Sequence, residues 1–469
     1  MRELTQLVCL TCIVAAACGQ EEPIRVGHHH QLFVDDHIIA RRDNIGLSLH
    51  NPTKCPLNPV LQAEHPWESK GVAIYGTAMY DEDEGMFKMW YRAIDDTCYV
   101  CYATSADGFT WQKPILNVMP HRGSTANNIV WGSHSFYIDG FAVYKDPREE
   151  DPARLYKMLT YKGHRGFAAM VSPDGIHWSG PVNDPAAHDT GDVISMYYDS
   201  GLGKYVALLK RRFVYQDPDG AEKRKRARLV SFSDDFTHWS EPQFSLVPDE
   251  QDPASTEFYS HVAFMYEGMR IGYISNFLVE TERIDSQLCY SRDGHKWERY
   301  RERIPFLPNG PEGTLDAGML IPGASDLIVR DGRLWIYYFG ANVDHAGRMY
   351  GDELKYGIGL ARLRLDGFVS ADADADGGTL TTKAIVCSGR TLRVNVDAPR
   401  GEVRAELLDE AGEPIEGYDL ACCLPYTGDS ISAPLMWHGR GTEGLIDRPV
   451  RIRFDLKNAQ LYSFWFAEE

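Results

Sequence analysis

Short stretches in which apolar and polar residues alternate follow one another along most of the chain, and they recur in the same order. One set comprises Tyr75–Asp81, Phe87–Ala93 and Cys98–Ser105. β-Branched and aromatic residues dominate these stretches, as in strands that bury one face of an antiparallel sheet. The pattern therefore predicts three consecutive strands.

The same set of three predicted strands returns four more times. The later sets are Gly140–Asp146, Arg154–Tyr161 and Gly166–Ser172; Val193–Asp199, Lys204–Lys210 and Arg226–Ser233; "HVAFMYEG", "RIGYISNF" and "SQLCYS"; and "SDLIVRDG", "RLWIYYFG" and "YGIGLARLRL". A β-unit that recurs in this way cannot bury both of its faces alone and must pack against its copies. We therefore expect a repeat architecture.

Each of the first four sets ends in a turn motif, in which Ser-x-Asp is followed by a Trp four residues after the Asp. The aspartates of the motif are Asp107, Asp174, Asp235 and Asp293, about 60 residues apart. The Ser and Asp side chains can hydrogen-bond the backbone of a turn before a fourth strand, and the Trp can pack between neighbouring units. A weaker fifth copy has Asp366 and Phe368 but no Trp. The motif predicts architecture and not catalysis.

Five four-stranded units arranged radially form a five-bladed β-propeller. Beyond them, Ala371–Gly378 is small and acidic, as linkers often are, and shorter alternating strands follow it. We expect an all-β protein with a propeller over residues 19–370, a linker over 371–378 and a C-terminal β-sandwich over 379–469. Asp372, Asp374 and Asp376 imitate the start of a calcium loop, but Lys383 stands where such a loop needs a bidentate acid, so no metal is predicted there.

The N-terminal residues 1–18 are typical of an export signal. Leu7–Ala17 is an apolar run of the length of a signal-peptide core, too short to span a bilayer, and it ends in small residues. A bacterial lipoprotein signal would place a lipid anchor on Cys18, and this alternative stays open. We expect a secreted or periplasmic protein, or with the lipid an outer-membrane lipoprotein, and no membrane-spanning segment.

The balance of charge narrows the range of partners. The chain has 67 acidic and 48 basic residues and a formal net charge of −19, which argues against nucleic acid or an anionic membrane as a partner and fits a neutral ligand. The basic run Glu222–Arg228 is expected to be a solvated hairpin tip. Cys98 and Cys101 lie in a predicted strand, where residues three apart point to opposite faces, so they are expected to be structural.

Acidic residues stand just before the first predicted strand of every unit. They are Glu68, Asp139, Asp189 with Asp192, Glu257 and Asp316. The innermost strands of a propeller line its central axis, so these carboxylates are predicted to converge on one cavity. Paired carboxylates at such a place are what the hydrolysis of a glycosidic bond requires.

With five blades, this turn motif and a terminal sandwich, the chain resembles the five-bladed propeller glycoside hydrolases, the group that holds families 32, 43 and 130. The segments "NPVLQAEHPWES", "NNIV" and "EGTLDAGM" resemble an uncharacterised bacterial branch of that group. The sequence lacks the Asn-Asp-Pro-Asn and Arg-Asp-Pro motifs, which disfavours the invertase activity of family 32.

The resemblance to family 43 implies roles for individual acids. Glu257 would be the general acid, with its pKa raised by Asp192 or Asp189, and Glu68 would be the base, although family 43 has Asp there. Asp36 is the rival for the base. Asp316 would bind sugar hydroxyls or replace one of the three acids.

The remaining expectations concern the ligand. Asp139 and Asp189, with Arg92, Arg212, His261 and His345, are the candidate contacts to the substrate. The predicted function is an exported glycoside hydrolase that acts on an oligo- or polysaccharide. The alternatives are a phosphorylase that resembles family 130 and needs a cationic pocket, and a carbohydrate-binding propeller without catalysis. No cofactor is predicted, and a central calcium ion is allowed by the resemblance alone.

Overall fold

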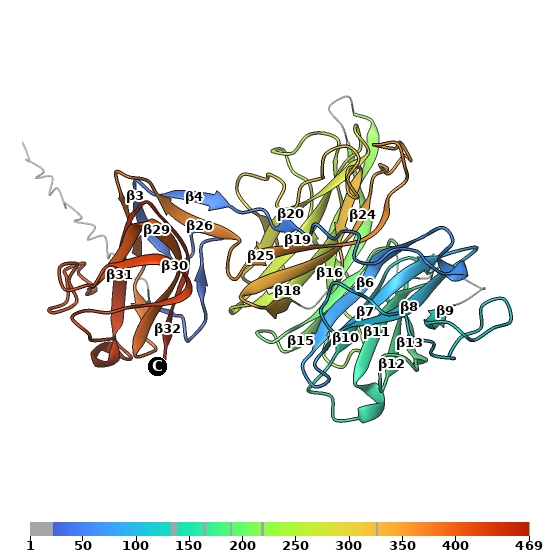
Figure 1. Cartoon of the computed structure of the whole chain (residues 1–469), viewed down its shortest axis with the longest axis horizontal. Helices are drawn as coiled ribbons and strands as arrows, with labels where there is room; N and C mark the ends of the chain where they lie inside the picture. Colours follow the sequence, from blue (N-terminus) through green and yellow to red (C-terminus); the bar gives the residue numbers. More distant parts are fainter. Residues whose placement is uncertain are drawn as a thin grey trace, which may run out of the picture.

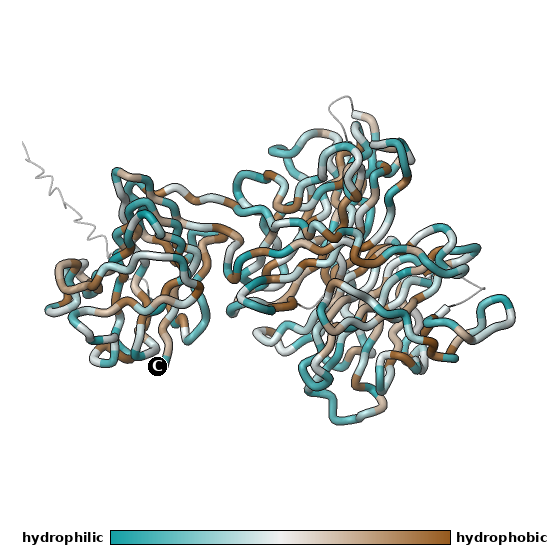
Figure 2. The backbone as a smooth tube through the Cα atoms, viewed as in Figure 1, coloured by the Kyte–Doolittle hydropathy of each residue, from teal (hydrophilic) through white to brown (hydrophobic). Residues whose placement is uncertain are grey.

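A computed structural model describes residues 22–132, 138–162, 166–187, 190–216, 220–324 and 327–468. The expected export signal over residues 1–18 and its Cys18 lie outside these ranges. The described chain forms two bodies joined by a few crossing segments, a larger one built from the middle of the chain and a smaller one built from both ends (Figure 1). Apolar segments follow the inner strands of both bodies, and hydrophilic segments follow the outer loops (Figure 2).

The larger body consists of five β-units, and the strands of the first three units form separate four-stranded antiparallel sheets. The first unit has β6 (Gly71–Asp81), β7 (Met86–Ile94), β8 (Cys98–Ser105) and β9 (Ile129–Gly132). The second has β10 (Phe141–Lys145), β11 (Tyr156–Tyr161), β12 (Phe167–Ser172) and β13 (Ser179–Ala187). The third has β14 (Ser195–Asp199), β15 (Lys204–Gln216), β16 (Glu222–Ser233) and β17 (Gln243–Leu246).

The fourth and fifth units share one nine-stranded sheet. The fourth unit has β18 (Thr256–Tyr266), β19 (Met269–Leu278), β20 (Arg283–Ser291) and β21 (Glu298–Arg299). The fifth has β22 (Met319–Pro322) and β23 (Ile328–Arg330), then β24 (Arg333–Ala341) and β25 (Tyr356–Arg364). Its fourth strand is β5 (Thr53–Lys54), which comes from before the first unit and pairs with β25. The sequence analysis placed the first strand of this unit at Ser325–Gly332 and missed both β22 and β5.

The five units pack around a common centre, as the predicted five-bladed propeller requires. The first strands β6, β10, β14 and β18 contact one another in this order. β20 of the fourth unit pairs with β22 of the fifth, and the backbone amide of Ala324 donates to the carbonyl of Gly76 in β6 at 2.9 Å. The contacts therefore run through all five units and return from the fifth to the first.

Short 3₁₀ turns stand at Pro66–Glu68 (η1), Pro152–Arg154 (η2) and Glu443–Leu445 (η3).

The repeated Ser-x-Asp motif closes the turn after the third strand, as predicted. The carboxylate of Asp174 accepts from the amides of Ile176 and His177 at 2.9 and 2.8 Å, and Ser172 Oγ accepts from the amide of Gly175. This turn of the second unit also binds the first unit, because the indole of Trp90 in β7 donates to the carbonyl of Gly175 at 2.6 Å. Burial would raise the pKa of Asp174, but these hydrogen bonds lower it to about 2.

The smaller body is one curled sheet of eleven strands, and its buried apolar side chains belong to a cluster that continues into the propeller. From the N-terminal part it takes β1 (Ile24–Arg25), β2 (Gln31–Leu32), β3 (Ile39–Asp43) and β4 (Gly46–Leu49). From the C-terminal part it takes β26 (Val369–Ala373), β27 (Gly378–Thr382), β28 (Ile385–Val386), β29 (Thr391–Leu408), β30 (Tyr426–Leu435), β31 (Pro449–Lys457) and β32 (Ala459–Ala467). Figure 1 shows β3 and β4 among the strands of the chain's end.

These pairings correct the expected boundaries. Residues before about 50 belong to the smaller body and not to the propeller, because Phe33, Val34 and Ile38 are needed in its core. The expected linker over 371–378 is also wrong, because β26 runs to Ala373 and pairs with both β4 and β32. Asp372 lies within β26 and Asp374 in the turn that follows it, so their acidic composition did not mark a break between domains. The seven described cysteines are free thiols.

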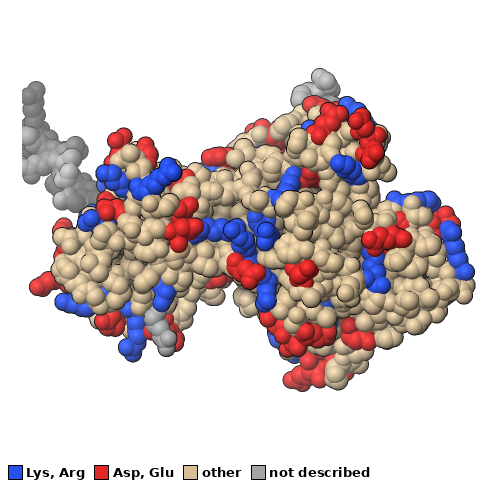
Figure 3. All heavy atoms as spheres, viewed as in Figure 1, with Lys and Arg blue, Asp and Glu red and all other residues tan. Residues whose placement is uncertain are grey.

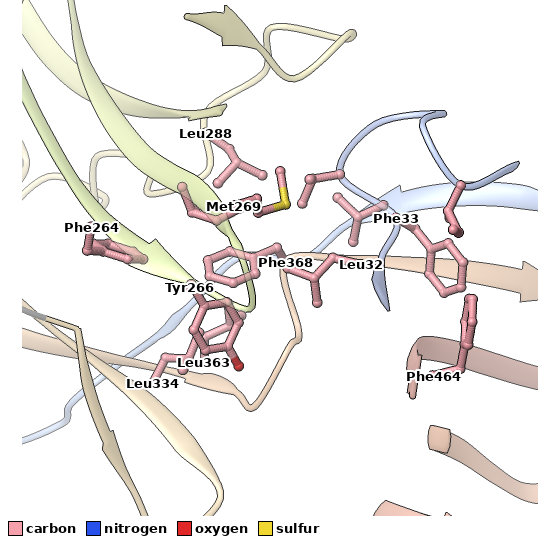
Figure 4. Close-up of a cluster of buried hydrophobic side chains, with 14 of the residues drawn as sticks. Leu32, Phe33, Phe264, Tyr266, Met269, Leu288, Leu334, Leu363, Phe368 and Phe464 are labelled. Atoms are coloured by element: carbon pink, nitrogen blue, oxygen red, sulfur yellow. The ribbon is translucent and has the colours of Figure 1, made fainter. Parts of the chain in front are cut away.

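An apolar cluster and one carboxylate join the two bodies. Figure 4 shows Phe368 between Tyr266 and Met269 of the propeller and Leu32 of the smaller body. Next to it, Asp366 accepts hydrogen bonds from three parts of the chain: His30 Nδ1 at 2.8 Å, the Tyr266 hydroxyl at 2.5 Å and Ser463 Oγ at 2.5 Å. Burial would raise the pKa of Asp366, but these donors and the charge of His30 hold it below its ordinary value.

Removing the turn carboxylate should loosen a blade. Asp174→Ala leaves the amides of Ile176 and His177 without their acceptor and should lower the free energy of unfolding by about 1–2 kcal/mol in chemical denaturation. Asp234→Ala, an exposed acid that pairs with Lys204 at 2.5 Å, is the control and should change stability by less than about 0.5 kcal/mol. Equal losses in both variants would show that the turn does not hold the blade.

The contact between the bodies should depend on pH. Burial would lower the pKa of His30, but its hydrogen bond to Asp366 raises the pKa above 6.5. The stability that this pair contributes is therefore fully present below pH 6.5 and is lost as the pH rises through the raised value. In thermal unfolding, His30→Gln should remove this part of the wild type's decline toward alkaline pH. A decline of the same size in both proteins would contradict the pairing.

Candidate active site

Two tyrosines meet at the centre of the propeller because the first strands that carry them are bulged. The pairing of β6 with β7 shifts between Ala73 and Thr77, and that of β18 with β19 shifts between Phe258 and His261. A bulge turns a side chain out of the regular alternation of a strand. Here the two bulges bring the hydroxyls of Tyr75 and Tyr259 to 3.5 Å, although their blades are not neighbours. Burial raises the pKa of both tyrosines, so both hydroxyls stay protonated at neutral pH.

An ion pair between the first and second blades borders Tyr75. Arg92, near the end of β7, pairs with Asp139, which directly precedes β10. The guanidinium of Arg92 also lies over the ring of Tyr75, with its Cζ 4.3 Å from the ring centroid. Arg92 is 6% exposed, so its charge is compensated by the Asp139 carboxylate and the aromatic face more than by water. Both residues were predicted as substrate contacts, and the structure brings them together.

A second ion pair comes from the third blade. Asp192 precedes β14 and pairs with Lys210 of β15, whose Nζ lies 4.5 Å from the centroid of the Tyr259 ring. Burial lowers the pKa of Lys210 to about 8, against the opposing charge of Asp192. Burial would raise the pKa of Asp192, but Lys210 and the more distant Arg226 hold it below its ordinary value. Asp192 is therefore a carboxylate at neutral pH.

The fourth blade supplies the third pair. Glu257, the second residue of β18, pairs with Arg226 of β16, whose Cζ lies 5.7 Å from the same Tyr259 ring. Glu257 is 8% exposed. The pairs of Asp192 and Glu257 thus both border Tyr259, as expected for two acids that serve one cavity. Deeper in the blade, Arg228 is fully buried and donates to the carbonyls of Tyr259 and Leu208 at 3.1 and 3.3 Å.

Three of the four cations of this centre, Lys210, Arg226 and Arg228, were not predicted as site residues. The run Glu222–Arg228 was expected to be a solvated hairpin tip, and this was wrong for its second half, because β16 carries Arg226 and Arg228 into the centre. Burial lowers the pKa of Arg228 to about 9. The alternation of Arg226 and Arg228 with Ala227, followed by an apolar strand, was the available signal that their side chains point to one side of a sheet.

Two predicted catalytic residues lie elsewhere. Glu68 is the last residue of η1 and is fully buried, and it accepts from the Tyr91 hydroxyl at 2.6 Å and from Lys113 Nζ at 2.8 Å. Its carboxylate is saturated by the protein and has no face toward a substrate, which corrects its assignment as the base. Its rival Asp36 is an exposed partner of Arg301 on the surface.

Asp316 lies in a separate cavity of about 690 Å³ and not beside Tyr259. The cavity is lined by residues of the fifth blade and of the segment that precedes the first blade. Among them are Lys54, Asn58, Asn309, Tyr338 and Tyr356. Lys54 Nζ lies 2.5 Å from the carboxylate of Asp316. Asp316 is the only carboxylate among the described residues that line this cavity, whereas glycosidic cleavage needs two.

The predicted histidines and the other basic contact also separate. His261 is fully buried, with its ring 4.5 Å from that of Trp297, and burial lowers its pKa well below the ordinary value, so it is a core residue and not a substrate contact. His345 stands at the rim, 5.5 Å from the Tyr259 ring, and pairs with Glu282. Arg212 is exposed on β15. Asp189 lies outside the described residues.

The arrangement unites three carboxylates and four cations around two protonated tyrosines. Such a centre can orient a polar substrate, and it holds ionised carboxylates that can activate water or attack a carbon. Within the described residues, no three carboxylate, His or Cys side chains are grouped so as to hold a metal ion. In that same part of the chain, no helix is long and apolar enough to cross a membrane. Figure 3 shows acidic and basic side chains interspersed over the face in view.

Neither a family model nor a curated protein matches the sequence. Among solved structures, the chain is similar to an N-acetylgalactosamine deacetylase from F. plautii in complex with blood group B trisaccharide, at 14% identity over 74% of this chain and 96% of that chain, with a TM-score of 0.41. It is also similar to a protein of the GH130 family of mannoside phosphorylases, reported to contain glycoside hydrolases that target beta-1,2 mannosidic linkages in Candida mannan (13% identity, 69% and 97% covered, TM-score 0.43).

A glycosyl hydrolase from Bacteroides ovatus gives similar values, with 14% identity, 69% and 97% coverage and a TM-score of 0.43. These similarities have identities of 13–14% and TM-scores of 0.41–0.43. They are too weak to assign an activity or a residue. The function is therefore argued from the side chains of the central site.

The ion pair of the third blade can be tested by titration. Asp192→Asn removes the charge that supports the Lys210 ammonium, so the pKa of Lys210 should fall below its value of about 8. The shift can be measured by NMR of ¹³C-labelled lysine side chains. Asp234→Asn removes an acid from Lys204 on the same sheet and should leave Lys210 unchanged. An unchanged Lys210 in Asp192→Asn would show that the pair does not form in solution.

Proposed function

We propose that the protein cleaves glycosidic bonds of an oligo- or polysaccharide at the centre of the propeller, by hydrolysis. The observation that carries the proposal is the approach of Asp192 and Glu257, from neighbouring blades, to one tyrosine through their paired cations. Glycoside hydrolysis needs one carboxyl group that protonates the leaving oxygen and a second carboxylate on the other side of the sugar. An exported location is part of the proposal.

The environments of the two acids suggest their roles. Asp192 is held in its charged form by Lys210, which suits the carboxylate that activates water or attacks the anomeric carbon. Glu257 is the candidate acid, and its pairing with Arg226 describes the protein without substrate. For Glu257 to donate a proton, the substrate must draw Arg226 away from it. The rings of Tyr75 and Tyr259 offer apolar faces and hydroxyl groups against which a sugar can be oriented.

A second candidate, phosphorolysis, is favoured by the number of cations. Arg92, Lys210, Arg226 and Arg228 outnumber the three acids with which they lie. A phosphorylase uses inorganic phosphate in place of water, and arginine and lysine are the residues that bind phosphate. The requirement for phosphate separates the two reactions.

Release of new reducing ends from a panel of polysaccharides and oligosaccharides, with and without phosphate, tests the proposal. Wild type should release them without phosphate, and both Glu257→Gln and Asp192→Asn should lower kcat by about 10²–10⁴-fold, because each removes one of the proton-transfer groups. Glu298→Gln, an exposed glutamate of the same blade as Glu257, is the matched control and should retain wild-type activity.

Three outcomes would contradict the proposal. Release that requires phosphate would establish phosphorolysis. Full activity in either central variant would remove that residue from the mechanism. Binding of a glycan without any release, with or without phosphate, would establish a carbohydrate-binding propeller without catalysis.

A further inference from the structure

One face of the β15–β16 hairpin carries five cations in a line. Residues directly opposite in the pair of strands share a face, and the register places Lys210 opposite Arg228, Arg212 opposite Arg226 and Val214 opposite Arg224. The two strands run from the centre of the propeller toward its edge (Figure 1). The four residue steps from Lys210 to Val214 span about 13 Å at the rise of an antiparallel strand. The cations of this face form a line and not a single point.

The line changes from buried to exposed along its length. Arg228 is fully buried and Lys210 is 6% exposed, whereas the side chain of Arg226 is 15% exposed and that of Arg224 is 65% exposed. Arg212 is also exposed. The inner end lies at Tyr259, beside the acids of the central site. A chain-like ligand that reaches the central site along this hairpin would therefore meet positive charge at every step.

This face has fewer acidic partners than cations, and the stability of the fold does not require such an excess of positive charge. Like charges directly opposite in neighbouring strands destabilise a sheet. Asp192 compensates Lys210 and Glu257 compensates Arg226, while Arg224 has Glu222 at 3.8 Å between two exposed side chains. In the described part of the chain, no carboxylate pairs with Arg212. The shortage of acids is local, because the whole chain has a net charge of −19.

The opposite face of the same hairpin differs in composition, because its three cations, Arg211, Lys223 and Lys225, share it with the aromatic rings of Phe213 and Tyr215. Lys225, one position from Arg224 and Arg226, packs its ammonium 4.9 Å from the centroid of the Tyr215 ring. A general need for solubility would not distinguish the two faces, because both are present on the same projecting element. We therefore attribute the row of Arg224, Arg226 and Arg228 to the binding of a negatively charged ligand.

We propose that this cationic face binds the acidic substituents of an anionic glycan, carboxylates or sulfate esters, and feeds that glycan into the central site. The inference rests on the proposed function and names its substrate class. Arginine binds planar oxyanions through paired N–H groups, and cations in line match charges repeated along a polymer. A free phosphate ion would need donors that converge on one point. An acidic group at Arg226 would also compete for the arginine that holds Glu257.

An anionic ligand departs from the neutral ligand that the composition favoured. The net charge of −19 fitted a neutral ligand, but an average over the chain does not describe the field inside one cleft. The position of five cations on one side of one hairpin determines the local potential. The sequence alone shows their number but not their common face.

Binding is measured separately from cleavage, by calorimetry at low and high salt. The probes are oligogalacturonides and sulfated galactan oligosaccharides, each compared with its neutral form made by carboxyl reduction or desulfation. Wild type should bind the charged forms at least about tenfold more tightly than the neutral ones at low salt, with the preference falling at high salt. Arg212→Gln with Arg224→Gln should weaken binding of the charged forms by about three- to tenfold and leave the neutral forms unchanged.

Lys225→Gln, a cation of the same hairpin on its other face, is the charge-matched control and should bind like wild type. Equal binding of charged and neutral glycans, or equal effects of the control and the arginine variants, would overturn the inference. So would equally tight binding of polyglutamate, which would show a surface for any polyanion. Competition by millimolar phosphate together with phosphate-dependent release would assign the cations to a co-substrate and overturn it as well.

The outcomes also separate this inference from the proposed function. Cleavage of a glycan that binds equally well in charged and neutral form would refute the charge preference, while the proposed cleavage of glycosidic bonds would still hold. A charge preference that depends on Arg212 and Arg224, without release from any glycan, would support the inference on substrate class while refuting catalysis.

Discussion

The compensation of buried cations by carboxylates is the interaction on which the centre of this propeller depends. Arg92, Lys210 and Arg226 lie where little water reaches them, and each has one acid, Asp139, Asp192 and Glu257, supplied by the start of a first strand. A buried charge without a partner is strongly destabilising. Each pair therefore holds two strands in a fixed relation, and the same pairs bring together carboxylates for chemistry.

The fold was predictable because it repeats. Alternation marked the strands of each blade, and the Ser-x-Asp turn showed where each blade ends, since the same hydrogen bonds recur at Asp107, Asp174, Asp235 and Asp293. The features that do not repeat were not predicted from the sequence. β5 completes the fifth blade from a distant part of the chain, and two residues of strand carry too little pattern to be recognised.

The boundary between the two bodies failed for a related physical reason. Composition suggested a linker at Asp372 and Asp374, but small acidic residues also occur at the end of a strand and in the turn that follows it. Whether the first strands of the chain pack with the propeller or with the C-terminal strands depends on contacts far apart in sequence. The weak fifth turn motif had the same ambiguity: its Asp366 does not hold a blade turn but binds His30, Tyr266 and Ser463 between the two bodies.

The site was predictable in part. The rule that acids before first strands face the axis placed Asp139, Asp192 and Glu257 correctly at the centre, but it also selected Glu68 and Asp316, which pair with Lys113 and Lys54 elsewhere. Every one of these acids is paired with a cation, which comes from the same blade for Glu68, Asp192 and Asp316 and from the preceding blade for Asp139 and Glu257, and the sequence does not show these pairings. The tyrosines depended on bulges in β6 and β18, which no alternation pattern reveals.

A structure of Glu257→Gln with an uncleaved acidic oligosaccharide would test the central claim most directly. The account predicts the sugar beside Tyr75 and Tyr259, with the glycosidic oxygen at hydrogen-bonding distance from residue 257, the carboxylate of Asp192 facing the anomeric carbon, and an acidic substituent on Arg226 or Arg212. A glycan bound instead in the cavity of Asp316 and Lys54, or away from both acids, would contradict it.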